Sequence, residues 1–161
     1  MKFIKSLFII SLSMLACYSA NANTQNSKAT TQEQKQTEKA LKQFSDAISL
    51  RFGGVEINNV NNQTIVNFNY SVENKSKKKI TQIHWETVYF YQDKAILVQD
   101  VPAPIKDGLN AKQSLPLVFS IPFDSLPEQT KAALSTQGAQ ISAQFRAKTI
   151  MFSDGSKIEV K

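Results

Sequence analysis

Residues 64–72 read Thr-Ile-Val-Asn-Phe-Asn-Tyr-Ser-Val, and apolar and polar side chains alternate along this stretch. Because successive side chains of a strand point to opposite faces, the apolar set falls on one face and the polar set on the other. The apolar set is Val66, Phe68, Tyr70 and Val72. One buried face and one wet face are typical of an antiparallel sheet, so this stretch predicts a β protein.

Six further stretches show strand patterns and are separated by turn residues. They are 55–60, 80–91, 94–101, 115–123, 141–151 and 157–160. Asn61-Asn62, Gln92-Asp93 and Asp154-Gly155 favour tight turns between neighbouring strands. Two prolines interrupt 115–123, and proline cannot donate to a ladder, so this strand is expected at a sheet edge. Residues 55–161 therefore predict an immunoglobulin-like antiparallel β-sandwich.

Two helices are expected beside these strands. An amphipathic helix is predicted over 31–52, because apolar residues recur there at helical spacing. Its stripe consists of Ala40, Leu41, Phe44, Ala47 and Ile48. Gly53-Gly54 is expected to end this helix. A short inserted helix is predicted to begin at Asp124 or Ser125 as its N-cap and to stop near Gly138.

The composition limits the function classes. A chain of 161 residues suits one domain of ordinary size. One Cys and one His argue against a disulfide framework, a cysteine zinc site and a multi-histidine metal site, so no metal and no cofactor is expected. The formal net charge of +6 is mild and is not gathered into a long basic stripe, so nucleic acid is not an expected partner.

The first 22 residues have the pattern of a signal peptide. Lys2 and Lys5 precede the apolar run 7–16, which is too short to span a bilayer. Ala20-Asn21-Ala22 supplies small residues for cleavage after Ala22. The pattern predicts export to the periplasm, followed by a flexible polar leader over 23–30.

A second interpretation of the same segment is a lipoprotein signal. Met14-Leu15-Ala16-Cys17 is similar to a bacterial lipobox. Cys17 would then carry the lipid and anchor the protein in the outer membrane. The sequence leaves both forms of export open.

Four motifs of the strand region carry a resemblance to a known family. They are Asn67-x-Asn69-Tyr70-Ser71-Val72-Glu73-Asn74, Ile80-x-x-Ile83, Val88-Tyr89-Phe90-Tyr91-Gln92-Asp93 and Phe152-x-Asp154-Gly155-Ser156. Over residues 55–161 the chain resembles the FxLYD and LEA-type immunoglobulin-like domains of bacterial envelope proteins. Lys94 stands where such domains often have glycine, and the FxLYD signature itself is not reproduced. The resemblance implies a non-enzymatic module with no shared catalytic residues.

The strand at 80–91 carries the first candidate binding face. Its outward positions are expected to be His84, Glu86, Val88 and Phe90. An outward Val and Phe need a cover, which is either the stripe of the 31–52 helix or a protein partner. A metal at His84 and Glu86 would need a third ligand, and no second histidine exists.

The second candidate is a lysine-rich loop between strands. Its members are Lys75, Lys77, Lys78 and Lys79. Such a loop is either a solvated turn or a contact for anionic lipid or an acidic partner.

Together these features favour a non-enzymatic exported envelope protein that acts as a protein-binding, adaptor or chaperone-like module. The alternative is a periplasmic inhibitor or immunity protein that neutralises a toxin or hydrolase. An enzyme that uses His84 is a third hypothesis. It ranks below the other two, because no nucleophile motif accompanies this residue.

Overall fold

The fold is described from a computed structural model, which covers residues 27–161, with side chains from residue 32 onward. The predicted signal peptide, its cleavage after Ala22, the lipidation of Cys17 and the first part of the predicted leader lie outside the described residues. Within the described part, no helix is both long enough and apolar enough to cross a membrane.

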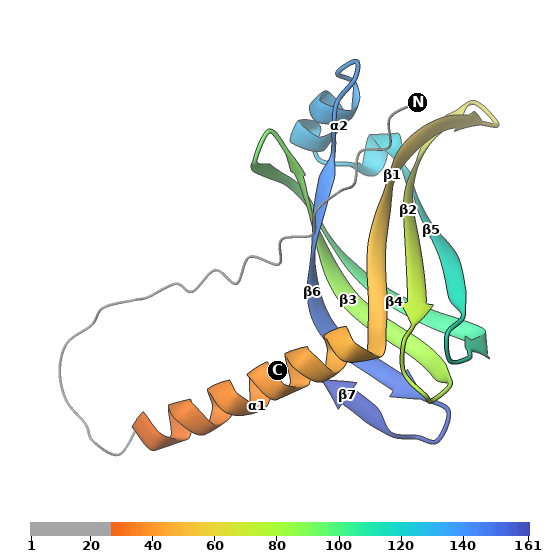
Figure 1. The fold of residues 1–161 in the computed structure, drawn as a ribbon. Coiled ribbons are helices and arrows are strands. Elements are labelled where there is room, and N and C mark those ends of the chain that lie inside the picture. Colours follow the sequence, from red (N-terminus) through yellow and green to blue (C-terminus); the bar gives the residue numbers. More distant parts are fainter. Residues whose placement is uncertain (1–26) are drawn as a thin grey trace, which may run out of the picture.

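Two antiparallel sheets face each other in the structure (Figure 1). The three-stranded sheet has the order β1-β2-β5, with β1 at Ile48–Val60, β2 at Gln63–Asn74 and β5 at Ser114–Pro122. The four-stranded sheet has the order β4-β3-β6-β7, with β3 at Ile80–Tyr91, β4 at Lys94–Leu109, β6 at Ser142–Phe152 and β7 at Lys157–Glu159. The predicted mainly β class and the edge position of the fifth strand are confirmed.

Two of the predicted turns set the register of their hairpins. Asn61 and Asn62 have φ of 49° and 64°, and Gln92 and Asp93 have φ of 48° and 60°. Positive φ at both central residues is the mark of a type I′ turn, whose twist suits a two-residue hairpin. Each turn therefore sets the pairing of the residues next to it, up to the first register shift of its hairpin.

The predicted end of the first helix was wrong. Helix α1 spans Ser27–Ala47, so it includes the last residues of the predicted leader, and β1 begins at Ile48 rather than after the two glycines. Leu50 and Phe52 continue a period of two and pack against the core, and this burial decides the conformation. Gly54 has a φ of 119° at a register shift after Phe52, so the glycines form a β-bulge.

The second helix also begins differently from the prediction. Residues Phe123–Ser125 form a 3-10 turn, and α2 spans Glu128–Leu134 with Pro127 at its N-cap. Pro127 has no N–H to donate, which suits a helix start. The Thr130 hydroxyl donates to the backbone carbonyl of Ile96 and so ties α2 to β4.

One hydrophobic core joins both sheets and the ends of both helices. Trp85, at the centre of β3, is fully buried and lies 5.6 Å from the Tyr70 ring of the facing sheet, measured between centroids. Phe44 from α1 and Ala133 from α2 belong to the same buried cluster. Burying a large apolar side chain such as Phe44 contributes about 1.5–3 kcal/mol, so the core holds the helix ends against the two sheets.

A polar network crosses the interior between the sheets. The Tyr70 hydroxyl and the Trp85 Nε1–H both donate to Thr87 Oγ1, at 3.1 and 2.9 Å. The Tyr89 hydroxyl contacts that of Tyr70 and donates to Gln99 Oε1 at 2.6 Å. Burial raises the pKa of both tyrosines, so they stay protonated donors. The network satisfies its own polar atoms and fixes how the sheets face each other.

Prolines stand on two edge strands, β4 and β5. They are Pro102, Pro104, Pro116 and Pro122. Within each strand the two prolines are an even number of residues apart, so their nitrogens point the same way. β4 pairs with β3, and β5 pairs with β2, without interruption at the prolines. The proline nitrogens therefore face the free edge of each strand, where no backbone N–H is needed for pairing. The prolines therefore remove donors from both edges and limit strand pairing with another chain.

Candidate functional site

The candidate residues of β3 form a row on the outer face of the four-stranded sheet. His84, Glu86, Val88 and Phe90 alternate with side chains that point into the core, among them Trp85 and Tyr89. Since β3 is flanked by β4 on one side and β6 on the other, this row runs along the middle of the sheet. Neighbouring strands therefore supply side chains to it from both sides.

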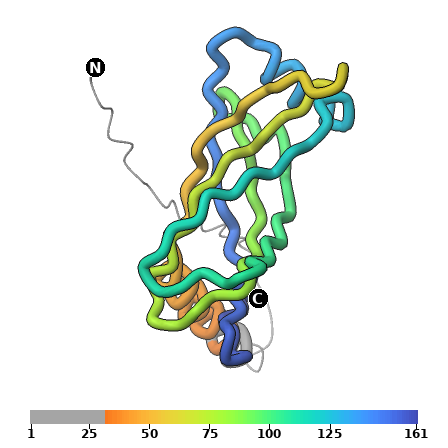
Figure 2. Tube along the Cα trace, turned by 90° about the vertical axis from the view of Figure 1, so that its right-hand side faces the viewer, coloured from red at the N-terminus to blue at the C-terminus, as the bar shows by residue number. Residues whose placement is uncertain are grey.

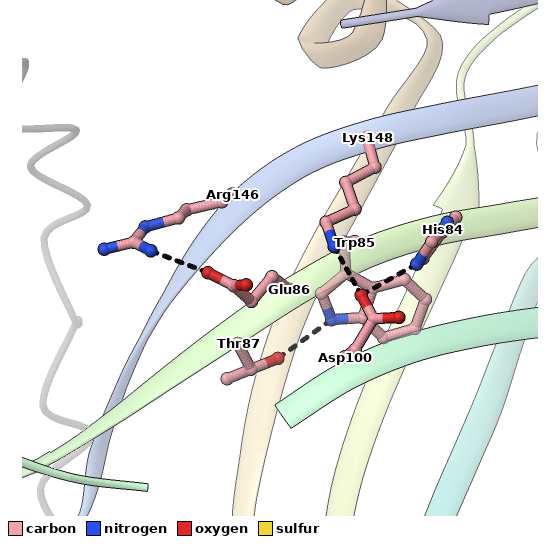
Figure 3. Close-up of polar contacts among 7 residues, drawn as sticks. All are labelled: His84, Trp85, Glu86, Thr87, Asp100, Arg146 and Lys148. Atoms are coloured by element: carbon pink, nitrogen blue, oxygen red, sulfur yellow. Dashed lines mark hydrogen bonds and ion pairs between the residues drawn. The ribbon is translucent and has the colours of Figure 1, made fainter. Parts of the chain in front are cut away.

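Two sets of ion pairs hold the charged half of the row (Figure 3). Arg146 of β6 donates to Glu86 at 2.7 Å. Asp100 of β4 accepts from His84 Nε2 at 2.8 Å and from Lys148 Nζ at 2.6 Å. The partner of His84 is thus Asp100 and not the nearby Glu86.

The electrostatics centre on Asp100. The Lys148 ammonium, and after it His84, hold the pKa of the Asp100 carboxyl below its usual range. Lys148 is the extra residue of a β-bulge, since His84 pairs with Thr149 and Trp85 pairs with Ala147. Lys148 lies two residues from Arg146 and on the same outer face, so β6 supplies two cations to this face.

The other half of the row is apolar. Val88 is only 5% exposed, although it is absent from the main core cluster, and Phe90 is half-buried. Val88 lies opposite Val98 of β4, which is 55% exposed, and opposite the exposed Gln144 of β6. The strands on both sides therefore shield Val88, and Phe90 and Val98 present the apolar surface.

Helix α1 does not supply the expected cover for this apolar half. It packs against β1, β6 and β7, and β7 pairs with β6 beside the first half of β3 (Figure 1). Phe44 and Ala47 of its stripe enter the main core instead. The idea that the stripe covers Val88 and Phe90 was therefore wrong.

The lysine-rich loop joins β2 to β3 and is held by its neighbours. Lys75 Nζ donates to the Ser45 carbonyl in the last turn of α1, and Lys78 pairs with Asp154 at 2.7 Å. Lys77 and Lys79 are exposed. The loop lies at the end of the two sheets where β3 begins, and Phe90 lies at the other end of β3, so the two candidate surfaces are separate.

Asp100, Arg146 and Lys148 were not predicted from the sequence. Each lies on a different strand from His84, and register shifts near Ile96 of β4 and at Lys148 of β6 change the cross-strand pairs by one residue. Among residues 27–161, no group of three His, Cys, Asp or Glu side chains is placed to hold a metal ion.

Comparisons with known proteins were made for the whole chain. No family model, no curated protein and no solved structure matches it. The resemblance of residues 55–161 to FxLYD and LEA-type domains stays a prediction.

Proposed function

We propose that this chain is a non-enzymatic exported envelope protein that binds another protein through the outer row of β3 and its neighbours. This surface, called here the β3 face, consists of His84, Glu86, Val88, Phe90, Val98, Asp100, Arg146 and Lys148. The observation that carries the proposal is that fixed ion pairs and exposed apolar side chains lie in one row along a central strand, and α1 packs against β1, β6 and β7 instead of this row.

Both halves of the β3 face suit protein recognition. The contacts hold two cations, the His84 imidazole and two carboxylates in set positions, which favours one arrangement of partner charges over others. Val98 and Phe90 provide apolar area that a partner buries. Because β3 is paired on both sides, this surface changes little on binding, which lowers its entropic cost.

The fold proposal within the β class is an immunoglobulin-like sandwich. The strand order β1-β2-β5 facing β4-β3-β6-β7 and the buried Trp85 on a central strand both support it. The export proposal rests on residues 1–22, with cleavage after Ala22 or lipidation at Cys17 as its two forms. The intact mass of the exported protein distinguishes these forms.

A capture experiment with matched variants tests the β3 face. Val98→Asp places a charge on it, and Val118→Asp is the control, because Val118 is also 55% exposed but lies on β5 of the other sheet. Immobilised wild type, Val98→Asp, Phe90→Asp and Val118→Asp are incubated with envelope extract. We expect partner recovery to fall at least tenfold for the first two variants and to persist for the control.

Each result decides between the hypotheses. Equal recovery by Val98→Asp and wild type, with both folded by circular dichroism, overturns the proposal. A single stoichiometric hydrolase or toxin that loses its activity when captured would instead identify an inhibitor or immunity protein. Turnover of a substrate that disappears in His84→Ala would establish an enzyme.

A further inference from the structure

Six lysines meet at one end of the sandwich, here called the lysine end. They are Lys75, Lys77, Lys78, Lys79, Lys106 and Lys112. The first four come from the β2–β3 loop, Lys106 lies near the end of β4, and Lys112 lies in the β4–β5 turn. Figures 1 and 2 show these segments together, beside the β6–β7 hairpin. Segments far apart in the sequence thus combine into one basic surface.

The buried Asn74 ties the segments of the lysine end together. Its side-chain amide donates to the carbonyls of Lys78 and Leu109, both at 2.8 Å. Its backbone N–H donates to the Gln113 carbonyl, and its own carbonyl accepts from the Lys112 N–H. The lysines are therefore displayed by a fixed scaffold, so little order is lost when the surface binds a ligand.

Most of these lysines have no internal counterion. Among the described residues, no carboxylate lies within 4.0 Å of the ammonium groups of Lys77, Lys79, Lys106 or Lys112. A Cβ added to Gly108 would clash with Lys79 Cε, so the glycine makes room for the Lys79 stem beside the end of β4. The acidic residues of this end are Glu73, Asp107, Asp154 and Asp46, and Asp46 is paired with Lys42 of α1. Positive charge is thus in excess here.

A shallow groove of about 470 Å³ lies within the same end. It runs between the end of β4 and the start of β5, and Lys106 is part of its lining. Half-buried Ile105 and Leu115 line it as well. An anionic group with apolar atoms behind it would meet both kinds of contact here.

The residue types of the lysine end indicate which class of ligand it binds. The six basic residues are all lysines. Lys78 Nζ lies over the ring of Phe152, but that ring is only 7% exposed and is not available for a base to stack on. Protein interfaces favour Arg, Tyr and Trp and are poor in Lys, and single-stranded nucleic acid is bound by stacking aromatics. Clustered lysine ammonium groups suit the phosphates of an anionic lipid surface. We propose that the lysine end docks on an anionic membrane surface, independently of the β3 face.

The test is co-sedimentation of the purified chain with lipid vesicles. One set contains phosphatidylglycerol in phosphatidylcholine, and the other contains phosphatidylcholine alone. The second set measures binding that needs no anionic lipid, such as binding through the apolar run within residues 1–26. We expect a clear preference for the anionic set, lost at high salt because exposed charges are screened. Each lysine at such a surface changes affinity about fivefold, so Lys77→Glu/Lys106→Glu should weaken binding at least tenfold.

A charge-matched control separates the lysine end from net charge. Lys94→Glu/Lys131→Glu changes the net charge equally, but places the change at the β3–β4 turn and on α2, at the opposite end (Figure 1). Binding by this control should remain near wild type. Equal binding to both vesicle sets, or equal loss in both variants, overturns the proposal. Polyglutamate serves as a second probe, which stands for an acidic protein. If Lys77→Glu/Lys106→Glu lost polyglutamate binding but kept vesicle binding, the proposal would also be overturned, in favour of an acidic protein.

Discussion

At the scale of single residues, Asn74 is the polar side chain on which the loop geometry depends. It is fully buried, its amide donates to two carbonyls, and its Oδ1 accepts from the N–H and hydroxyl of Ser76. Each buried group left without a partner costs about 1–3 kcal/mol. We expect Asn74→Ala to lower the free energy of unfolding in urea by about 2–4 kcal/mol. Asn58→Ala, at an exposed position of β1, is the control and should change it little.

Asp100 gives the β3 face a pH dependence. Its pKa is lowered in the folded protein, first by Lys148 and then by His84, so its pairs contribute stability above the unfolded pKa of about 4. This contribution is lost as the pH falls through the folded value. The difference in unfolding free energy between wild type and Asp100→Asn should therefore be largest near neutral pH and shrink below about pH 4. A difference that stays constant down to about pH 2.5 would contradict this pairing.

At the scale of elements, the two neighbouring glycines of β1 have different roles. Gly54 has a φ of 119°, which side chains rarely adopt, whereas a Cβ at Gly53 would make only ordinary contact with Asn69. We expect Gly54→Ala to cost about 1–3 kcal/mol in urea unfolding. Gly53→Ala should stay within about 1 kcal/mol of wild type, because it also restricts the unfolded chain. Equal costs for both would argue against the bulge.

The proline-bearing edges make a prediction about association. Pro104→Thr/Pro116→Thr returns one N–H to the free edge of β4 and one to that of β5. Unpaired donors favour pairing with another chain, so light scattering should detect more association of the folded variant at high protein concentration. Pro127→Ala, at the start of α2 and away from both edges, is the control. A variant that remains monomeric alongside this control would show that the prolines do not protect the edges.

At the scale of the whole molecule, one core predicts one unfolding transition. Trp85 is the single tryptophan, and its ring lies against Tyr70 of the facing sheet and 6.0 Å from Phe119 of β5. Its environment therefore requires both sheets. Trp85 fluorescence and the circular dichroism of the strands should change at the same urea concentration. A fluorescence change at clearly lower urea would mean that the sheets separate before they unfold.

How much of the candidate site could be predicted depends on whether a sequence pattern lies within one strand or spans two. Alternation along β3 was enough to put His84, Glu86 and Phe90 on one face, because the period of two is local. Asp100 was not predictable in the same way. Counting back from the Gln92-Asp93 turn places Gln99 opposite Glu86, but the register shift near Ile96 brings Asp100 there instead. Such a shift depends on how the strands pack.

The sequence by itself determined the mainly β class, the two hairpin turns at 61–62 and 92–93 and the edge position of β5, because alternation, turn chemistry and missing proline donors are properties of short segments. Tertiary structure decided that α1 ends at Ala47, that it enters the core rather than covering the β3 face, and which charges meet there. The stretch after Ala47 satisfies both a helical stripe and a strand alternation. Only burial against the facing sheet distinguishes these two, and that burial exists only in the assembled fold.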